Sequence, residues 1–118
     1  MLPLKNRLKK KDFKEVFKKG KGFKQGPLFL KVLSNNLQKS RFGFVVGKKI
    51  FKKATERNKI KRQLREMVRA RIEKIQKGAD VILIVFSPPP KKTFQELEKF
   101  LDKVFLQAKI LSPRKINF

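Results

Sequence analysis

The sequence predicts a single α+β domain in which helices pack on a small, mixed sheet. Three stretches repeat apolar residues at helical spacing, and the stretches between them have the alternation or the β-branched content of strands. A chain of 118 residues has room for one hydrophobic core of ordinary size. We therefore predict one domain over residues 1–118, with residues 1–10 and 112–118 flexible.

The first helix is predicted for residues 10–20. Phe13, Val16 and Phe17 lie at i, i+3 and i+4 and so share one face. Lysines at the end of this stretch, followed by Gly20, are typical of a helix terminus. The two phenylalanines are interpreted first as core residues. A second interpretation leaves one edge of each ring exposed to stack on the bases of a single strand.

Strands are predicted on both sides of the second helical stretch. Residues 27–35 and 40–49 form two strands joined by a polar turn, preceded at 21–27 by a short edge strand or a loop. The continuous apolar run 79–86 is typical of a central strand that is covered on both faces.

Alternation along residues 40–49 separates two faces. Phe42, Phe44 and Val46 are expected to face the core. The opposite face carries mainly small side chains: Gly43, Val45 and Gly47. We expect a groove or a close backbone contact there.

The second helix is predicted from about Thr55 to Gln76. Its apolar stripe consists of Ile60, Leu64, Met67, Val68, Ile72 and Ile75. After a proline-rich loop, Thr93 and Glu96 predict a capping box at the start of the last helix. Its predicted buried residues are Phe94, Leu97, Leu101, Val104, Phe105 and Ala108.

The charge balance indicates a polyanionic partner. The chain has 33 Lys and Arg against 9 Asp and Glu, a formal net charge of +24. Self-repulsion of this size is tolerated where a polyanion screens it, and nucleic acid is favoured over an anionic membrane. No apolar run approaches the roughly 20 residues of a spanning helix, no secretory signal is visible, and there is no cysteine. We expect a monomeric, cytoplasmic protein.

Much of this charge lies on the second helix. A helical wheel places six polar residues on one arc, next to the apolar stripe: Arg57, Asn58, Lys61, Arg62, Arg65 and Arg69. A basic helical face is more often simply solvated. Here the net charge and the lysines that precede the helix favour nucleic acid.

Catalytic chemistry by the chain itself is not expected. The sequence has no His and no Cys, and its few acids are scattered. The closest pair, Glu98 and Asp102, is flanked by lysines on the last helix. We therefore predict no catalytic residue and no metal site in the protein.

The stretch KKIFKKATERNKIKRQLRE resembles the arginine-rich RNR signature of the bacterial ribonuclease P protein subunit. The matching positions are Lys48, Lys49, Ala54, Arg57, Asn58, Lys61, Arg62, Arg65 and Glu66. Flanking stretches RLKKKDFKEVFKKGK, RFGFVVGKK and GADVILIV agree in order and spacing, so the resemblance covers roughly residues 5–110.

The resemblance implies a fold and a function. The expected fold is an αβββαβα two-layer sandwich with a mixed four-stranded sheet and a left-handed crossover through the basic helix. The expected partners are a catalytic RNA and precursor tRNA, whose 5′ leader is removed by Mg²⁺-dependent hydrolysis. The RNA subunit would supply the reactive groups and bind most of the Mg²⁺.

The resemblance also implies two sets of contact residues. The set expected to bind the catalytic RNA is Lys48, Lys49, Lys53, Arg57, Asn58, Lys61, Arg62 and Arg65. The set expected to bind the leader is Lys9, Phe13, Phe17, Phe29, Lys31 and Val45. Lys31 departs from the family pattern, which often has an aromatic residue there, so Phe29 is a candidate for the displaced stacking surface.

Three other functions compete with this one. A structural RNA-binding protein of the ribosomal type would bind RNA without promoting cleavage. A DNA-binding regulator is disfavoured because no recognition helix or dimer seam is visible. A protein-only nuclease would need catalytic side chains that this sequence does not provide.

Overall fold

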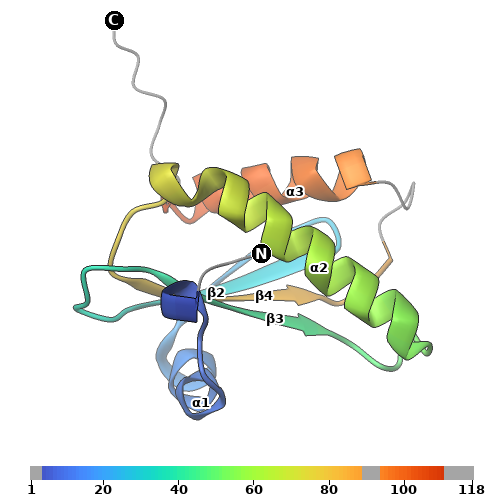
Figure 1. Ribbon diagram of the computed structural model, residues 1–118, viewed down its shortest axis with the longest axis horizontal. Helices are drawn as coiled ribbons and strands as arrows, with labels where there is room; N and C mark the ends of the chain where they lie inside the picture. The colour runs from blue at the N-terminus through green and yellow to red at the C-terminus, as the bar shows by residue number, and fades with distance from the viewer. Residues whose placement is uncertain (1–3, 89–93, 111–118) are drawn as a thin grey trace, which may run out of the picture.

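The computed structural model describes residues 4–88 and 94–110 (Figure 1). Its element order confirms the predicted αβββαβα arrangement. The elements are η1 (Leu4–Asn6), α1 (Lys10–Lys19), β1 (Lys21–Gln25), β2 (Leu28–Ser34), β3 (Arg41–Val46), α2 (Ala54–Arg71), η2 (Ile72–Lys74), β4 (Ala79–Val85) and α3 (Phe94–Gln107).

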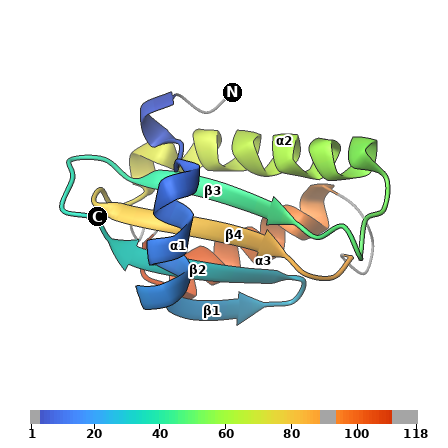
Figure 2. The same ribbon diagram turned by 90° about the horizontal axis from the view of Figure 1, so that it is seen from below.

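The four strands form one mixed sheet in the order β1-β2-β4-β3. β2 is antiparallel to both of its neighbours, whereas β3 is parallel to β4. The expected central strand is β4, whose residues are buried except for the half-buried Ile84. The connection β3–α2–β4 is left-handed, against the usual hand of such crossovers (Figures 1 and 2).

The helices cover both faces of the sheet. α2 and α3 lie on one face and enclose the main core, where the Phe42 and Phe105 ring centroids are 6.3 Å apart. α1 crosses the strands on the opposite face, as Figure 2 shows. The predicted two-layer sandwich therefore corresponds to the sheet with α2 and α3, and α1 adds a partial layer on the other side.

A second, smaller core lies beneath α1. Val16 is fully buried there with Leu8 and Ile82. A β-carbon at Gly43 would collide with the Phe13 ring, so the bare position of β3 receives that ring. The groove predicted along the Gly43 face is thus filled by Phe13 at this point, and the predicted close contact is made by a side chain.

Several predicted boundaries were wrong. β3 ends at Val46, so Gly47 lies beyond the strand. α2 ends at Arg71 and continues as the 3-10 turn η2. Phe94 is 39% exposed, although helical periodicity predicted burial, because it lies at the first residue of α3. The predicted cap residue Thr93 lies outside the described residues.

The segment before α1 is packed against the sheet. Asn6 and Leu8 are buried, and the Leu8 amide donates a hydrogen bond of 2.8 Å to the Phe42 carbonyl. Asn6 donates a side-chain hydrogen bond of 2.8 Å to the Ser40 carbonyl. We expected residues 1–10 to be extended and flexible, whereas this part of them borders β3.

Candidate nucleic-acid interface

α2 presents its cations away from the core. Leu64, Met67 and Val68 are buried against the sheet, which fixes the rotation of the helix. Arg62 and Asn58 are exposed, while Lys61 and Arg65 are half-buried. Among the described residues, the ion pairs of α2 involve Glu66, Arg69 and Arg71, and none involves Lys61, Arg62 or Arg65. The uncompensated charge therefore lies in the N-terminal two-thirds of the helix.

Arg57 supports the loop that precedes α2. Its Nη1 donates hydrogen bonds of 2.8 Å to the Phe51 carbonyl and 3.0 Å to the Lys52 carbonyl. Arg57 is half-buried in this position. Lys48, Lys49 and Lys53 are exposed on the same loop, so the fold holds them next to the start of α2.

Arg71, at the C-terminal end of α2, is a structural cation. Its Nε lies 2.6 Å from Asp102 and its Nη2 lies 2.8 Å from Glu98, both on α3. The hydrogen bond that Arg71 donates to Asp102 raises the pKa of Arg71, against the opposing effect of partial burial. These contacts account for the acidic pair that the sequence places on α3: it joins α3 to α2.

The α1 face of the sheet brings most of the second predicted set together. Register places Val45, Ile84 and Phe29 side by side on neighbouring strands, facing the side that α1 crosses. Phe17 is 42% exposed, and its ring centroid is 6.3 Å from that of Phe13. The surface formed by Phe17, Phe29, Val45 and Ile84 is called the α1 face below. Lys9 lies exposed just before α1.

The predicted leader-binding set lacks Ile84 and Lys24, which the structure places on the same face of the sheet as Phe29. The Lys24 ammonium lies 5.0 Å from the centroid of the Phe86 ring, a cation–π contact that joins β1 to the end of β4. Alternation along β4 predicts the side on which Ile84 lies, because Ile84 is two residues after the buried Ile82 and so points to the same face of the sheet. Nothing in the sequence indicated the partner of Lys24.

Two sheet residues fix the position of α1. Lys31 Nζ donates hydrogen bonds of 3.2 Å to the Phe17 carbonyl and 3.3 Å to the Gly20 carbonyl, and so caps the C-terminus of α1. Arg41 contacts the buried Asp80 at 2.6 Å and Asp12, in the first turn of α1, at 3.3 Å. The hydrogen bond that Arg41 donates to Asp80 raises the pKa of Arg41. The predicted contact residue Lys31 thus orients the helix that carries Phe13 and Phe17.

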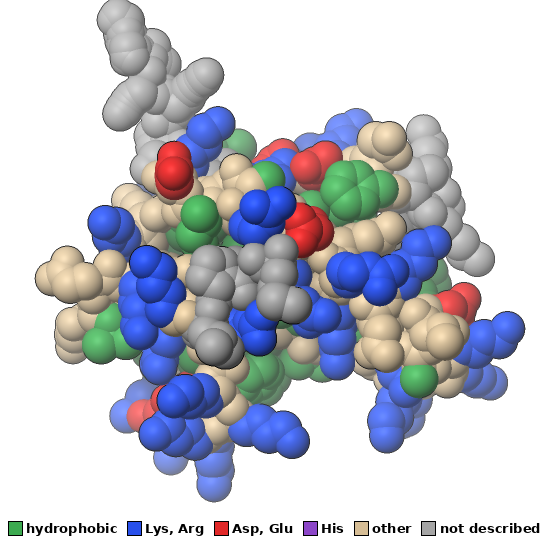
Figure 3. All heavy atoms as spheres, in the orientation of Figure 1, with side chains coloured by type: hydrophobic (Ala, Val, Ile, Leu, Met, Phe, Trp, Pro, Cys, Tyr) green, Lys and Arg blue, Asp and Glu red, His purple; other side chains and the backbone are tan. Residues whose placement is uncertain are grey.

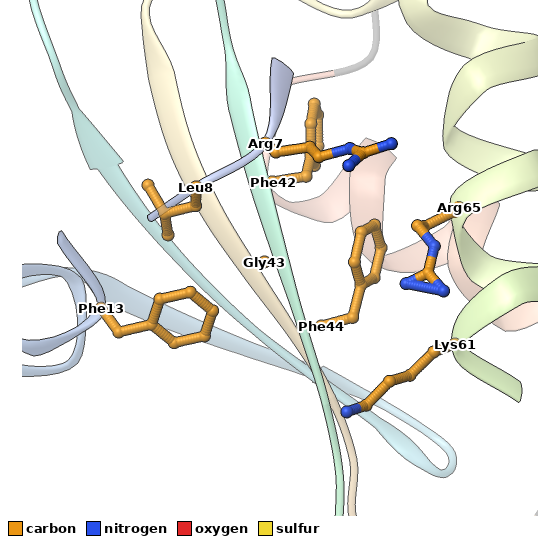
Figure 4. A pocket seen from close by; sticks show the side chains of 8 residues that line it. All are labelled: Arg7, Leu8, Phe13, Phe42, Gly43, Phe44, Lys61 and Arg65. Carbon is orange, nitrogen blue, oxygen red and sulfur yellow. The ribbon is translucent and has the colours of Figure 1, made fainter. Parts of the chain in front are cut away.

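A groove lies between the N-terminal segment, β3 and α2 (Figure 4). Its volume is about 380 Å³. The lining residues are Arg7, Leu8, Phe13, Phe42, Gly43, Phe44, Lys61 and Arg65. Arg7 had not been singled out, because its nearness to Lys61 and Arg65 depends on tertiary structure.

The positive surface extends beyond α2. Figure 3 shows Lys and Arg side chains over α1 as well as along α2. No group of three or more His, Cys, Asp or Glu side chains is placed to hold a metal ion within residues 4–88 and 94–110. A search of the same residues finds no helix with the length and hydropathy of a membrane span.

Comparison with known proteins decides the family. The model of the family described as Ribonuclease P matches residues 2–109. The chain belongs to this family. Among its relatives, a ribonuclease P protein component from Pseudanabaena is 37% identical over 113 residues, covering 94% of this chain and 97% of that protein. One from Thermotoga maritima is 40% identical over 90 residues, covering 76% and 73%.

Solved structures of the family agree with the fold. The Staphylococcus aureus RNase P protein matches with a TM-score of 0.82 at 29% identity, covering 91% of this chain and 98% of the other. The Thermotoga maritima protein matches with a TM-score of 0.78 at 32% identity, covering 86% and 96%. The resemblance drawn from the sequence is confirmed. The chain is the protein subunit of the ribonucleoprotein enzyme ribonuclease P, whose role is tRNA 5′-leader processing, and its partner is RNA.

Proposed function

We propose that α2 and the loop before it bind the catalytic RNA, while the α1 face binds the single-stranded leader of precursor tRNA. The observation that carries this proposal is the run of α2 cations that have no carboxylate partner among the described residues. Like charges spaced at i,i+4 destabilise an isolated helix slightly, and phosphates placed against them reverse the sign of that effect.

The catalytic-RNA contacts divide by exposure. Lys48, Lys49, Lys53, Asn58 and Arg62 are exposed and suited to phosphate contacts from outside. Lys61 and Arg65 are half-buried at the rim of the groove. Arg57 acts mainly by holding the loop that carries the three lysines, because its Nη1 is bonded to two loop carbonyls.

The proposed leader contacts combine aromatic rings with lysine side chains. An exposed Phe17 ring on α1, together with Phe29 and Val45 on the sheet face that α1 crosses, offers an apolar surface on which unpaired bases stack. Phe13 is half-buried, so its main contribution is to hold α1 on Gly43. Lys31 contributes indirectly, because it caps the C-terminus of the helix that carries Phe17. Lys9, which is exposed just before α1, is placed to contact a phosphate.

The chemistry in this proposal belongs to the RNA. Mg²⁺ prefers oxygen ligands such as phosphates, and we propose that the RNA holds the ions that drive hydrolysis. The side chains of this chain neutralise phosphates and reduce the repulsion between two RNAs. The complex would act in the cytoplasm, where precursor tRNA is made.

A cleavage assay tests the proposal. Precursor tRNA is incubated with a bacterial-type catalytic RNA at low Mg²⁺, with and without the full chain. Stimulated release of the leader is expected, because the protein replaces part of the charge neutralisation that Mg²⁺ otherwise provides. RNA binding without stimulation would instead indicate a structural RNA-binding protein.

A further inference from the structure

The groove beside β3 lies between the two surfaces of the proposed function and shares Lys61 and Arg65 with the surface that binds the catalytic RNA. Phe13 and Leu8 border it from the side of α1, whereas Lys61 and Arg65 border it from α2. Figure 4 shows the Phe13 ring pointing toward Gly43 from one side of β3, with Arg7, Lys61 and Arg65 on the other side. A strand of RNA that passed from the α1 face to α2 would cross this groove.

The floor of the groove is an edge of the sheet. β3 is the last strand in the sheet order, so its outer side has no neighbouring strand of the sheet. The N-terminal segment covers the first part of this edge, where the Leu8 amide bonds to the Phe42 carbonyl. Successive residues of a strand point their backbone N–H and C=O groups to opposite edges. Phe44 is two residues after Phe42, so its amide and carbonyl point to the same outer edge as those of Phe42. A donor and an acceptor are thereby presented next to Lys61 and Arg65.

The groove thus combines three features that recognise a nucleotide. It has cations for a phosphate, an aromatic ring at Phe44 for a base, and backbone polar groups for a base edge. Its volume of about 380 Å³ lies in the range of roughly 300–1,000 Å³ that small-molecule sites occupy.

We propose that this groove seats one unstacked nucleotide of single-stranded RNA. Lys61 and Arg65 bind its phosphate, and the base lies against Phe44 at the open edge of β3. The inference rests on the proposed function, because it assigns the place where RNA passes between the two binding surfaces. The same chemistry serves a nucleotide of the leader near the scissile bond or one of the catalytic RNA.

Two variants probe the phosphate and the base separately. Lys61→Ala combined with Arg65→Ala removes the cations. We expect the fold to be kept, because both residues are half-buried at most and neither makes an ion pair among the described residues. Phe44→Leu keeps an apolar side chain in contact with the core but removes the aromatic ring. Arg62→Ala is the matched control, since Arg62 is an exposed α2 arginine that does not line the groove.

The assay measures binding of modified RNAs to the holoenzyme. One set carries a single neutral methylphosphonate, and the other a single abasic residue, at each successive position of the leader and of the catalytic-RNA segments next to α2. In the wild-type holoenzyme we expect one nucleotide at which either change weakens binding about tenfold, the size of one lost base stack. With the Lys61/Arg65 double variant, the loss of affinity caused by the methylphosphonate should fall below about twofold. With Phe44→Leu, the loss of affinity caused by the abasic residue should fall below about twofold as well.

The position of the sensitive nucleotide identifies the source of the RNA. A sensitive position in the leader or in the catalytic RNA supports the inference and assigns the strand. The inference would be overturned if the groove variants left the losses of affinity caused by the modified nucleotides unchanged at every position. It would also be overturned if Arg62→Ala reduced these losses equally. Continued stimulation of cleavage at low Mg²⁺ by the wild-type chain would confine that failure to the groove, whereas loss of stimulation would count against the proposed function itself.

Discussion

The C-terminal end and the middle of α2 use arginine in opposite ways. At the C-terminal end, Arg71 is only 15% exposed and is bound by two carboxylates of α3. In the middle of the helix, Arg62 and Arg65 have no carboxylate partner among the described residues. Both parts belong to the same continuous helix, so helix propensity does not distinguish them. The partner decides the role: α3 at the C-terminal end and, in our proposal, RNA in the middle.

Four of the acids join elements of the fold. Glu98 and Asp102 are placed against Arg71, and Asp12 and Asp80 against Arg41. Glu66, which lies close to Arg62 and Arg65 on α2, is paired with Arg69. Among the described residues no ion pair places a carboxylate on Arg62 or Arg65, where it would compete with phosphate.

The largest effect on stability is expected from Arg71→Ala. The change leaves Glu98 and Asp102 without their shared cation, so the free energy of unfolding should fall by about 1–3 kcal/mol. Urea denaturation measures this value. Arg62→Ala should stay within about 0.5 kcal/mol of the wild type. Equal losses for both variants would remove the distinction between the middle and the C-terminal end of α2.

A smaller effect, on substrate binding alone, is expected from Phe17→Ala. Loss of one stacking surface should weaken precursor tRNA binding by the holoenzyme about five- to tenfold and leave mature tRNA binding unchanged. Phe94→Ala provides a control of similar exposure, at 39% against 42%, on the helix at the opposite face. Equal weakening for precursor and mature tRNA would contradict the assignment of the leader to the α1 face.

The smallest effect is expected from Lys31→Met. It removes the ammonium that caps the C-terminus of α1 but keeps most of the apolar stem, so the free energy of unfolding should fall by about 0.5–1 kcal/mol. Amide hydrogen exchange in α1 should become faster. Lys31→Arg should restore most of the protection, whereas unaltered exchange in Lys31→Met would show that the cap does not hold the helix.

Local pattern predicted the elements and the main core. The stripe of α2 and the apolar run of β4 follow from periodicities that the sequence displays directly. The left-handed crossover followed only from the family resemblance, because general rules favour the other hand. Phe94 was misplaced because periodicity gives the face of a helix but not how far the neighbouring layer extends.

The candidate site was predictable in part. Helical spacing placed the α2 cations on one arc, but it could not separate Arg57, which bonds to the preceding loop, from Arg62, which is exposed. The contacts of Lys31 with α1 and of Phe13 with Gly43 join residues far apart in the chain. The groove at β3 requires three segments to meet, and no local pattern contains that information.

The salt dependence of catalytic-RNA binding tests the central claim most directly. If Lys61, Arg62 and Arg65 neutralise phosphates, replacing all three by alanine should reduce the slope of log K against log salt concentration by about 2–3. Arg71→Ala, measured under conditions in which it is folded, should leave the slope unchanged. An unchanged slope for the triple variant would show that these cations face water, and would contradict the account.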